Sequence, residues 1–226
     1  MGKKRASKSS QPNGNQPLID KWRRMAGLGD REAMCNLGVA YKLGDMVPQD
    51  SERAVEWWRK SVIRGFAPAM NHLGWAYHSG SGVDKDRTKS LKYWKQAVSN
   101  GCKPAFFSLG LAHFFGLGTP VNKEKGLDLW QKGANLGDPA SQYSLGKAYE
   151  DGDGVAYDIE RAVKYYTLSS QQGNPTAHYR LGLIYKETNN LMRQDLDKAF
   201  HHLRSAVLIN NPSLLELDTN TSGLEE

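Results

Sequence analysis

The sequence is poor in cysteine and contains no long apolar run. Cys35 and Cys102 are the only cysteines among 226 residues, too few for a small secreted domain held together by disulfides. We therefore expect two free, half-buried thiols in a reducing compartment. The most apolar window, residues 105–118, is interrupted by Ser108 and His113, and it is shorter than the roughly 20 residues that span a bilayer. These shortages argue against a disulfide-rich protein and against a membrane protein.

The amino-terminal segment also lacks the apolar core of a signal peptide. Residues 1–16 carry four positive charges and no acid, whereas residues 213–226 carry four negative charges and no base. We expect a disordered basic tail at 1–16 and an acidic tail at 212–226. The expected location is the cytoplasm, and Lys3-Lys4-Arg5 leaves nuclear import open.

The chain repeats itself with a period of 36 residues. A Leu-Gly pair recurs five times at this spacing, and three residues after each pair comes a tyrosine or, once, a histidine. The pairs begin at Leu37, Leu73, Leu109, Leu145 and Leu181. A constant period of this length is typical of a solenoid of stacked repeats.

Each repeat contains two helical segments separated by a glycine-rich turn. Ala33, Leu37 and Tyr41 are spaced by four residues and would share one face of the first helix. Glycine in the turn suits the left-handed conformation that ends such a helix. An Asp or Asn then offers a side-chain oxygen that caps the second helix. These capping residues are Asp50, Asp86, Asn122 and Asp158.

The second helix of each repeat carries a small residue followed by an aromatic residue four positions later. We expect the small residue to let two helices approach closely and the aromatic ring to fill the gap. The pairs are Ala54 and Trp58, Ser90 and Trp94, Gly126 and Trp130, and Ala162 and Tyr166. Leu18 and Trp22 match this helix one period earlier, so a lone second helix over about Leu18–Leu28 precedes the first full repeat.

These signals predict an all-α protein of eleven helices, a right-handed α-solenoid of antiparallel helix pairs. The fifth repeat needs one inserted residue between Glu187 and Arg193 to stay in register. We expect the solenoid to span 17–211. Its predicted parts are a half-unit at 18–29 and repeats at 30–65, 66–101, 102–137, 138–173 and 174–210.

The pattern Ala-x-x-x-Leu-Gly-x-x-Tyr, then Gly-x-Gly-Val, then Asp-x-x-x-Ala resembles the Sel-1-like repeat, a relative of the tetratricopeptide repeat. The copy at 141–173 shows it clearly, with Gly152-Asp153-Gly154-Val155 complete. The resemblance covers Leu18–Asn210. It implies a tetratricopeptide-like superhelix that serves as a scaffold or adaptor in assembling protein complexes.

In tetratricopeptide-like solenoids the first helix of each pair lines a concave groove, which implies three groove positions per repeat here. These positions vary between repeats while the Leu-Gly-Tyr positions are nearly constant, so packing leaves them free for binding. The implied groove residues are Asn71, Trp75, His78, Phe107, Leu111, Phe114, Tyr143 and Lys147. We expect the aromatic ones to bind a peptide or helix of another protein. The alternative is that Phe107, Phe114 or Phe115 belongs to the core between repeats.

The sequence has no signature of a catalytic nucleophile, and its six histidines lack metal-ligand spacing. We therefore expect a non-enzymatic interaction scaffold with no cofactor and no metal ion. The alternative function is an RNA-binding helical repeat, because pentatricopeptide repeats have nearly the same period. The mixture of apolar and charged groove residues argues against regular base recognition. An observation of RNA binding with a steep salt dependence would favour the RNA-binding alternative. The oligomeric state stays open.

Overall fold

The computed structural model describes residues 16–187 and 196–210, and within these ranges every regular element is an α-helix. The helices are α1 (Gln16–Gly27), α2 (Arg31–Leu43), α3 (Ser51–Ile63), α4 (Ala67–Ser79), α5 (Arg87–Ser99), α6 (Lys103–Phe115), α7 (Lys123–Asn135), α8 (Pro139–Asp151), α9 (Ile159–Ser170), α10 (Pro175–Glu187) and α11 (Leu196–Asn210). The predicted count of eleven is confirmed for the described residues. Apart from Gln16, the predicted tails lie outside them, and so does most of the segment assigned to the inserted residue.

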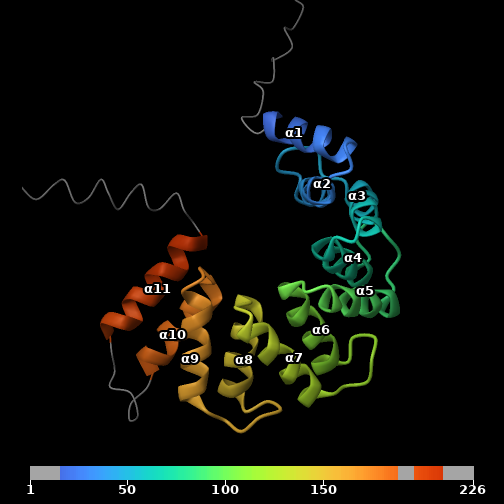
Figure 1. The fold of residues 1–226 in the computed structure, drawn as a ribbon. Coiled ribbons are helices and arrows are strands. Elements are labelled where there is room, and N and C mark those ends of the chain that lie inside the picture. Colours follow the sequence, from blue (N-terminus) through green and yellow to red (C-terminus); the bar gives the residue numbers. More distant parts are fainter. Residues whose placement is uncertain (1–15, 188–195, 211–226) are drawn as a thin grey trace, which may run out of the picture. The chain divides into compact units, whose positions relative to one another are not determined.

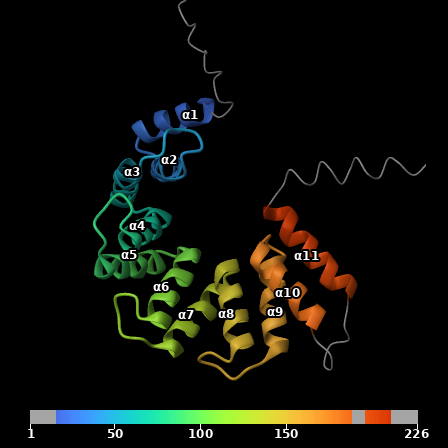
Figure 2. The same ribbon diagram turned by 180° about the vertical axis from the view of Figure 1, so that it is seen from behind.

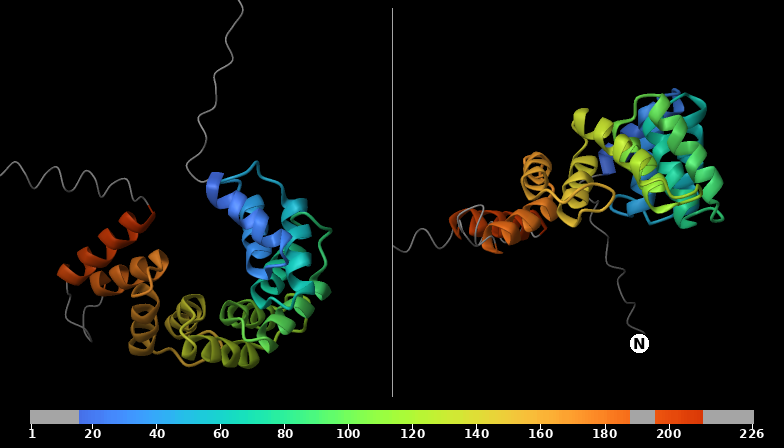
Figure 3. Two further views of the ribbon diagram at one scale, coloured as in Figure 1. Left: turned by 45° about the horizontal axis from the view of Figure 1, so that its top comes forward. Right: turned by 90° about the horizontal axis from the view of Figure 1, so that it is seen from below.

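The helices belong to two compact units, Met1–Gly101 and Cys102–Glu226. In the first unit α1 packs on α2, and α2–α3 and α4–α5 form helix pairs (Figure 1). In the second unit the pairs α6–α7, α8–α9 and α10–α11 follow one another, as the view from behind also shows (Figure 2). Two further views show the helices of each unit packed beside their neighbours in chain order (Figure 3). The predicted all-α architecture of stacked helix pairs is confirmed.

Helix starts and ends follow the capping residues that the sequence indicates. The side chains of Asp50, Asp86, Asn122 and Asp158 each accept a hydrogen bond from the backbone N–H three residues later, at 2.8–3.0 Å. The first helices end at glycines in the left-handed conformation, with φ of 78° at Gly44 and 65° at Gly152. Local chemistry therefore sets the length of each helix.

In four of the five repeats the glycine of the Leu-Gly pair lies directly against the aromatic ring of the second helix, and in the fifth Gly182 lies against Leu203. A Cβ atom placed on Gly74 would be 2.3 Å from Nε1 of Trp94, and one on Gly38 would be 2.4 Å from Nε1 of Trp58. Because real Cβ atoms do not approach so closely, only glycine allows this helix spacing. The repeated glycine is therefore a packing residue, and the small residue of the second helix contributes further: Ala54 is fully buried.

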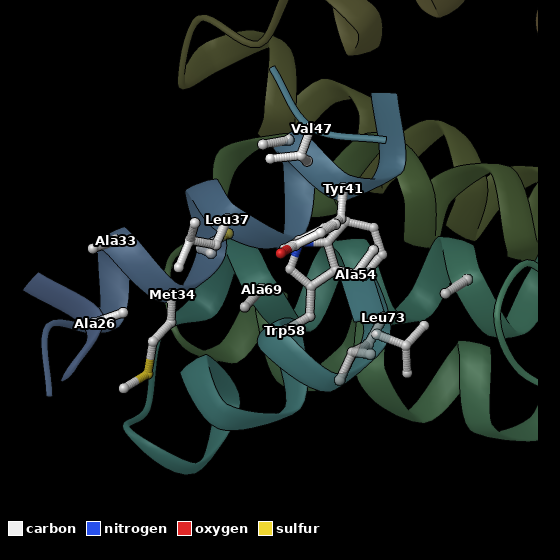
Figure 4. Close-up of a cluster of buried hydrophobic side chains, with 14 of the residues drawn as sticks. Ala26, Ala33, Met34, Leu37, Tyr41, Val47, Ala54, Trp58, Ala69 and Leu73 are labelled. Atoms are coloured by element: carbon white, nitrogen blue, oxygen red, sulfur yellow. The ribbon is translucent and has the colours of Figure 1, made fainter. Parts of the chain in front are cut away.

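The core of the first unit shows how one repeat is filled. Leu37 and Tyr41 of α2, Trp58 of α3 and Leu73 of α4 all belong to one buried cluster (Figure 4). Helix α4 packs on the α2–α3 pair and covers this cluster, which a single helix pair could not bury alone.

Neither cysteine forms a disulfide, as expected from their number. They are fully buried rather than half-buried, with 3% of Cys35 and 6% of Cys102 exposed. Burial raises the pKa of the Cys102 thiol, so this cysteine is an apolar packing residue rather than a reactive thiolate.

Candidate functional site

The second unit contains an apolar hollow between α6, α7 and α8, which we call the α6–α8 hollow. Its volume is about 380 Å³. It is lined by Phe107, Leu111, Phe114, Phe115, Trp130, Tyr143, Ser144, Lys147, Ala148, Asp151 and Asp153. Five of the eight predicted groove residues therefore meet in one place.

Stacked aromatic rings form the floor of the α6–α8 hollow. Phe114 is 3% exposed and stacks on Trp130, with 4.7 Å between ring centroids. Phe115 meets Phe114 edge to face at 4.9 Å and is 57% exposed. The indole N–H of Trp130 donates to the backbone oxygen of Phe107 at 3.2 Å. This bond satisfies the polar atom of the ring and fixes its orientation.

Ion pairs form the rim of the same hollow. Lys147 pairs with Asp151 one helical turn away at 2.6 Å, and Lys123 pairs with Asp153 of the following repeat. The Lys123 ammonium also lies 5.4 Å from the centroid of the Phe114 ring. Because these pairs are close to half exposed, they contribute little stability and can exchange partners at low cost.

The first unit contains a second hollow between α2, α3 and α4, which we call the α2–α4 hollow. Its volume is about 240 Å³. It is lined by Val39, Lys42, Leu43, Trp58, His72, Trp75, Ala76, Ser79 and Ser81. Of the eight predicted groove residues, Trp75 alone lines it.

Aromatic stacking also builds the wall of the α2–α4 hollow. The His72 ring stacks on Trp58 at 5.0 Å, and Trp75 contacts Trp94 at 5.1 Å. Burial lowers the pKa of His72, so this wall is neutral at pH 7. Lys42 is the one charged lining residue, and its ammonium donates to the Ser81 hydroxyl at 2.5 Å.

The two hollows are the same structural site repeated 72 residues apart. Every lining residue of the α2–α4 hollow has its counterpart, two periods later, in the α6–α8 hollow. Trp58 corresponds to Trp130, and Ala76 corresponds to Ala148. The chemistry differs at the rim, where Ser79 and Ser81 are replaced by Asp151 and Asp153. Repeat stacking therefore creates the hollow, and the variable side chains give each copy a different charge and polarity at its rim.

Two predicted groove residues line neither hollow. Asn71 is 8% exposed and is buried in α4; its amide is shorter than the Tyr143 ring that occupies the equivalent position. His78 is half-buried, with its ring edge to face on Trp75 at 5.6 Å. Burial, together with Lys85 and Arg87, lowers the pKa of His78.

Sequence reasoning missed the part of the site that comes from the second helix and the turn. The repeat pattern predicts only a packing role for Trp130, which also lines the α6–α8 hollow. Asp153 belongs to the turn after α8, for which the sequence pattern predicts only a glycine-dependent helix end. The pair between Lys123 and Asp153, thirty residues apart, marks this turn as part of the site.

The histidines form one unexpected contact in the second unit. Nδ1 of His178 in α10 lies 2.9 Å from Nδ1 of His202 in α11, and Tyr185 stacks on His202 at 5.8 Å. In the described part of the chain, no three His, Cys, Asp or Glu side chains are arranged to hold a metal ion. Likewise, no helix in the ranges 16–187 and 196–210 is long and apolar enough to cross a membrane.

We expect the second unit to lose stability as the pH falls from 6.5 toward 4. Burial, followed by the charges of His178, His201 and Lys198, lowers the pKa of His202 to about 4. Between pH 6.5 and about 4, His202 therefore binds a proton in the unfolded chain but not in the folded chain. The free energy of unfolding is highest above pH 6.5 and decreases as the pH falls through this range. Thermal unfolding at pH 7.5, 6.0 and 4.5 should show a shallower pH dependence for His202→Phe, which keeps a ring against Tyr185. An unchanged slope in this variant, or an equal change in His201→Gln, would contradict the expectation.

Comparison with protein families matches the Sel1 repeat at residues 31–66, 67–102, 105–138, 139–174 and 175–210. A search of curated proteins finds no match. Among solved structures, the chain is similar to a Sel1 repeat protein from Oxalobacter formigenes, with 28% identity, coverage of 84% of this chain and 76% of that one, and a TM-score of 0.77.

Two further solved structures are similar over most of this chain. One is c5321, a protective antigen of uropathogenic Escherichia coli displaying an SLR fold, with 29% identity, coverage of 84% of this chain and 40% of that one, and a TM-score of 0.67. The other is the immunity protein Pa5087 from Pseudomonas aeruginosa, with 27% identity, coverage of 87% and 68%, and a TM-score of 0.57. The five family matches cover more than half of the sequence, and the chain therefore belongs to the Sel1 repeat family.

Proposed function

We propose that this protein is a scaffold or adaptor whose α6–α8 hollow binds an apolar side chain of another protein, presented on a helix or an extended peptide. Sel1 repeats generally serve as scaffolds for protein–protein interaction. The observation that carries the proposal for this chain is the exposure of aromatic surface in a concave site. Phe115 is more than half exposed beside the half-buried Phe107 and Leu111.

The composition of the α6–α8 hollow supports a protein ligand. Binding energy at protein interfaces is concentrated where an aromatic or aliphatic anchor fills a pocket that excludes water. An apolar centre surrounded by a polar rim is the usual anatomy of such an interface. The aromatic floor supplies this centre, and the pairs of Lys147 with Asp151 and of Lys123 with Asp153 supply the rim. A leucine, phenylalanine or tryptophan flanked by polar residues would fit both parts.

The α2–α4 hollow is a second anchor site with a different preference. Its rim has one ammonium, Lys42, and the hydroxyls of Ser79 and Ser81 in place of two carboxylates. These groups favour an apolar residue that is followed by Asp or Glu. Each hollow would thus take its own segment, which is how a repeat protein brings partners together.

The proposal is tested by affinity capture followed by titration of the captured partner against variants of each hollow. Phe107→Ala should weaken binding at the α6–α8 hollow by about 10-fold or more, the loss that follows removal of an anchor contact. Trp75→Ala should do the same for a partner of the α2–α4 hollow. Neither truncation should unfold the protein, because both side chains are only half-buried.

Matched controls separate binding from stability. Phe200→Ala removes a phenylalanine that is 69% exposed on α11, and Trp57→Ala removes a tryptophan of α3 that lines neither hollow. Both controls should keep full affinity. If Phe107→Ala and Trp75→Ala bind as tightly as the wild type, or if they lose binding only because they melt at low temperature, the proposal is wrong.

A further inference from the structure

A third hollow lies between α10 and α11, at the carboxy-terminal end of the described residues. Its volume is about 390 Å³, and its lining includes Pro175 and Tyr179 of α10 with Ala206, Val207 and Asn210 of α11. Tyr179 is 49% and Val207 is 51% exposed. The last described helix pair of the solenoid therefore has an uncovered apolar face.

Earlier helix pairs of the second unit show what fills the equivalent place. Ser141, the third residue of α8, is fully buried, and its Oγ lies 2.3 Å from where a Cβ atom on Gly133 of α7 would stand. Ala177 takes the same position in α10 and is also fully buried. By the repeat register, with one inserted residue in the fifth repeat, Ala206 is the counterpart of Gly133. The first turn of the next repeat thus covers this surface each time.

The sequence after α11 repeats the start of such a helix. Asp138-Pro139-Ala140 begins α8 and Asn174-Pro175-Thr176 begins α10, and Asn211-Pro212-Ser213 stands in the next register position. The Asp138 carboxylate accepts the backbone N–H of Ser141 at 2.8 Å, and the Asn174 side chain accepts that of Thr176 at 3.0 Å. Asn211 has the same capping chemistry, and proline suits the first helical position.

We propose that residues 211–217 begin the first helix of a sixth repeat, which docks onto the α10–α11 hollow and places Leu214 over Ala206. Leu214 takes the position of Ser141 and Ala177, and its larger side chain is accommodated by the volume that is open there. This segment would cover Tyr179 and Val207, and an apolar end face that is covered in this way does not aggregate.

The length of the following chain is sufficient for this role. Sixteen residues follow Asn210, since the sequence runs to residue 226, whereas a first helix such as α8 has thirteen. The segment follows α11 directly in the sequence, so its docking closes no large ring. These two facts favour the chain's own segment over a second copy or a separate partner as the occupant.

The test compares Leu214→Asp with Leu224→Asp in the full-length chain, because both place a carboxylate on a leucine of the same tail. Hydrogen–deuterium exchange should become at least tenfold faster in α10 and α11 for Leu214→Asp, while Leu224→Asp should match the wild type. Leu214→Ala should keep most of the protection, because alanine occupies this position in α10. Equal exchange in all three variants would overturn the proposal.

The same samples distinguish the other occupants. Sedimentation of the wild type should show a monomer at micromolar concentration. A dimer that dissociates on Leu214→Asp would mean that the tail docks onto a second copy and would overturn the proposal. If Leu214→Asp precipitates, Leu214→Asn, which adds no charge, takes its place. Faster exchange in α10 and α11 is then expected, and exchange equal to that of the wild type would overturn the proposal.

Discussion

Replacement of Gly74 by alanine is expected to lower the free energy of unfolding by about 3 kcal/mol, the upper part of the range for overpacking a core. The new Cβ atom would be 2.3 Å from Nε1 and 2.4 Å from Cδ1 of Trp94. Trp94 is fully buried and contacts Trp75, so its ring cannot move aside. Alanine is the better helix former by about 1 kcal/mol, but this gain is smaller than the cost of the clash. Thermal or urea unfolding measures the difference.

Two other glycines serve as controls for this prediction. Gly27, at the end of α1, has nothing within 4 Å of an added Cβ, so Gly27→Ala should change stability by less than about 1 kcal/mol. In Gly182→Ala the new atom meets Cγ of Leu203 at 2.6 Å. The leucine side chain can rotate, so we expect an intermediate loss. Equal stabilities for Gly74→Ala and Gly27→Ala would show that the ring and the helix spacing adjust freely.

Replacement of Glu150 by alanine is expected to cost about 3 kcal/mol, the lower end of the range for removing one partner of a buried ion pair, because this pair is only partly buried. Glu150 accepts hydrogen bonds from the Tyr166 hydroxyl at 2.6 Å and from Nε of Arg180 at 3.1 Å, and it pairs with a second guanidinium nitrogen. Only 13% of the Glu150 side chain and 28% of the Arg180 side chain are exposed. The variant therefore leaves a guanidinium and a buried hydroxyl without this acceptor, between α8, α9 and α10.

The matched comparison is the exposed pair of Lys132 and Asp128, whose side chains are 58% and 56% exposed. Asp128→Ala should cost less than about 1 kcal/mol, because water screens this pair. The double variant Glu150→Ala, Arg180→Ala should be less destabilised than the sum of its two single variants. Chemical denaturation of the four variants and the wild type measures both differences, and a Glu150→Ala variant as stable as Asp128→Ala would contradict the expectation.

The helix pairs could be predicted from the sequence because each depends on neighbouring residues. Asp86 caps α5, and Gly80 ends α4, through bonds that close within a few positions along the chain. Only part of the candidate site could be predicted from the sequence. Leu111 and Lys147 occur in the expected columns of the repeat and line the α6–α8 hollow, but the same reasoning placed Asn71 in the groove, although it is buried. At equivalent positions of the repeats, the length of the side chain and the neighbouring turn decide which residue reaches the surface.

A period of 36 residues was enough to specify a stack of helix pairs, since caps, turns and apolar faces are encoded locally and recur. The hollows could not be inferred in the same way, because each combines the first helices of two successive repeats with the second helix between them. The contact of Trp130 with Phe114, and that of Lys123 with Asp153, arises when helices distant in sequence pack together. Packing of this kind depends on the three-dimensional fit of side chains, which a linear pattern does not record.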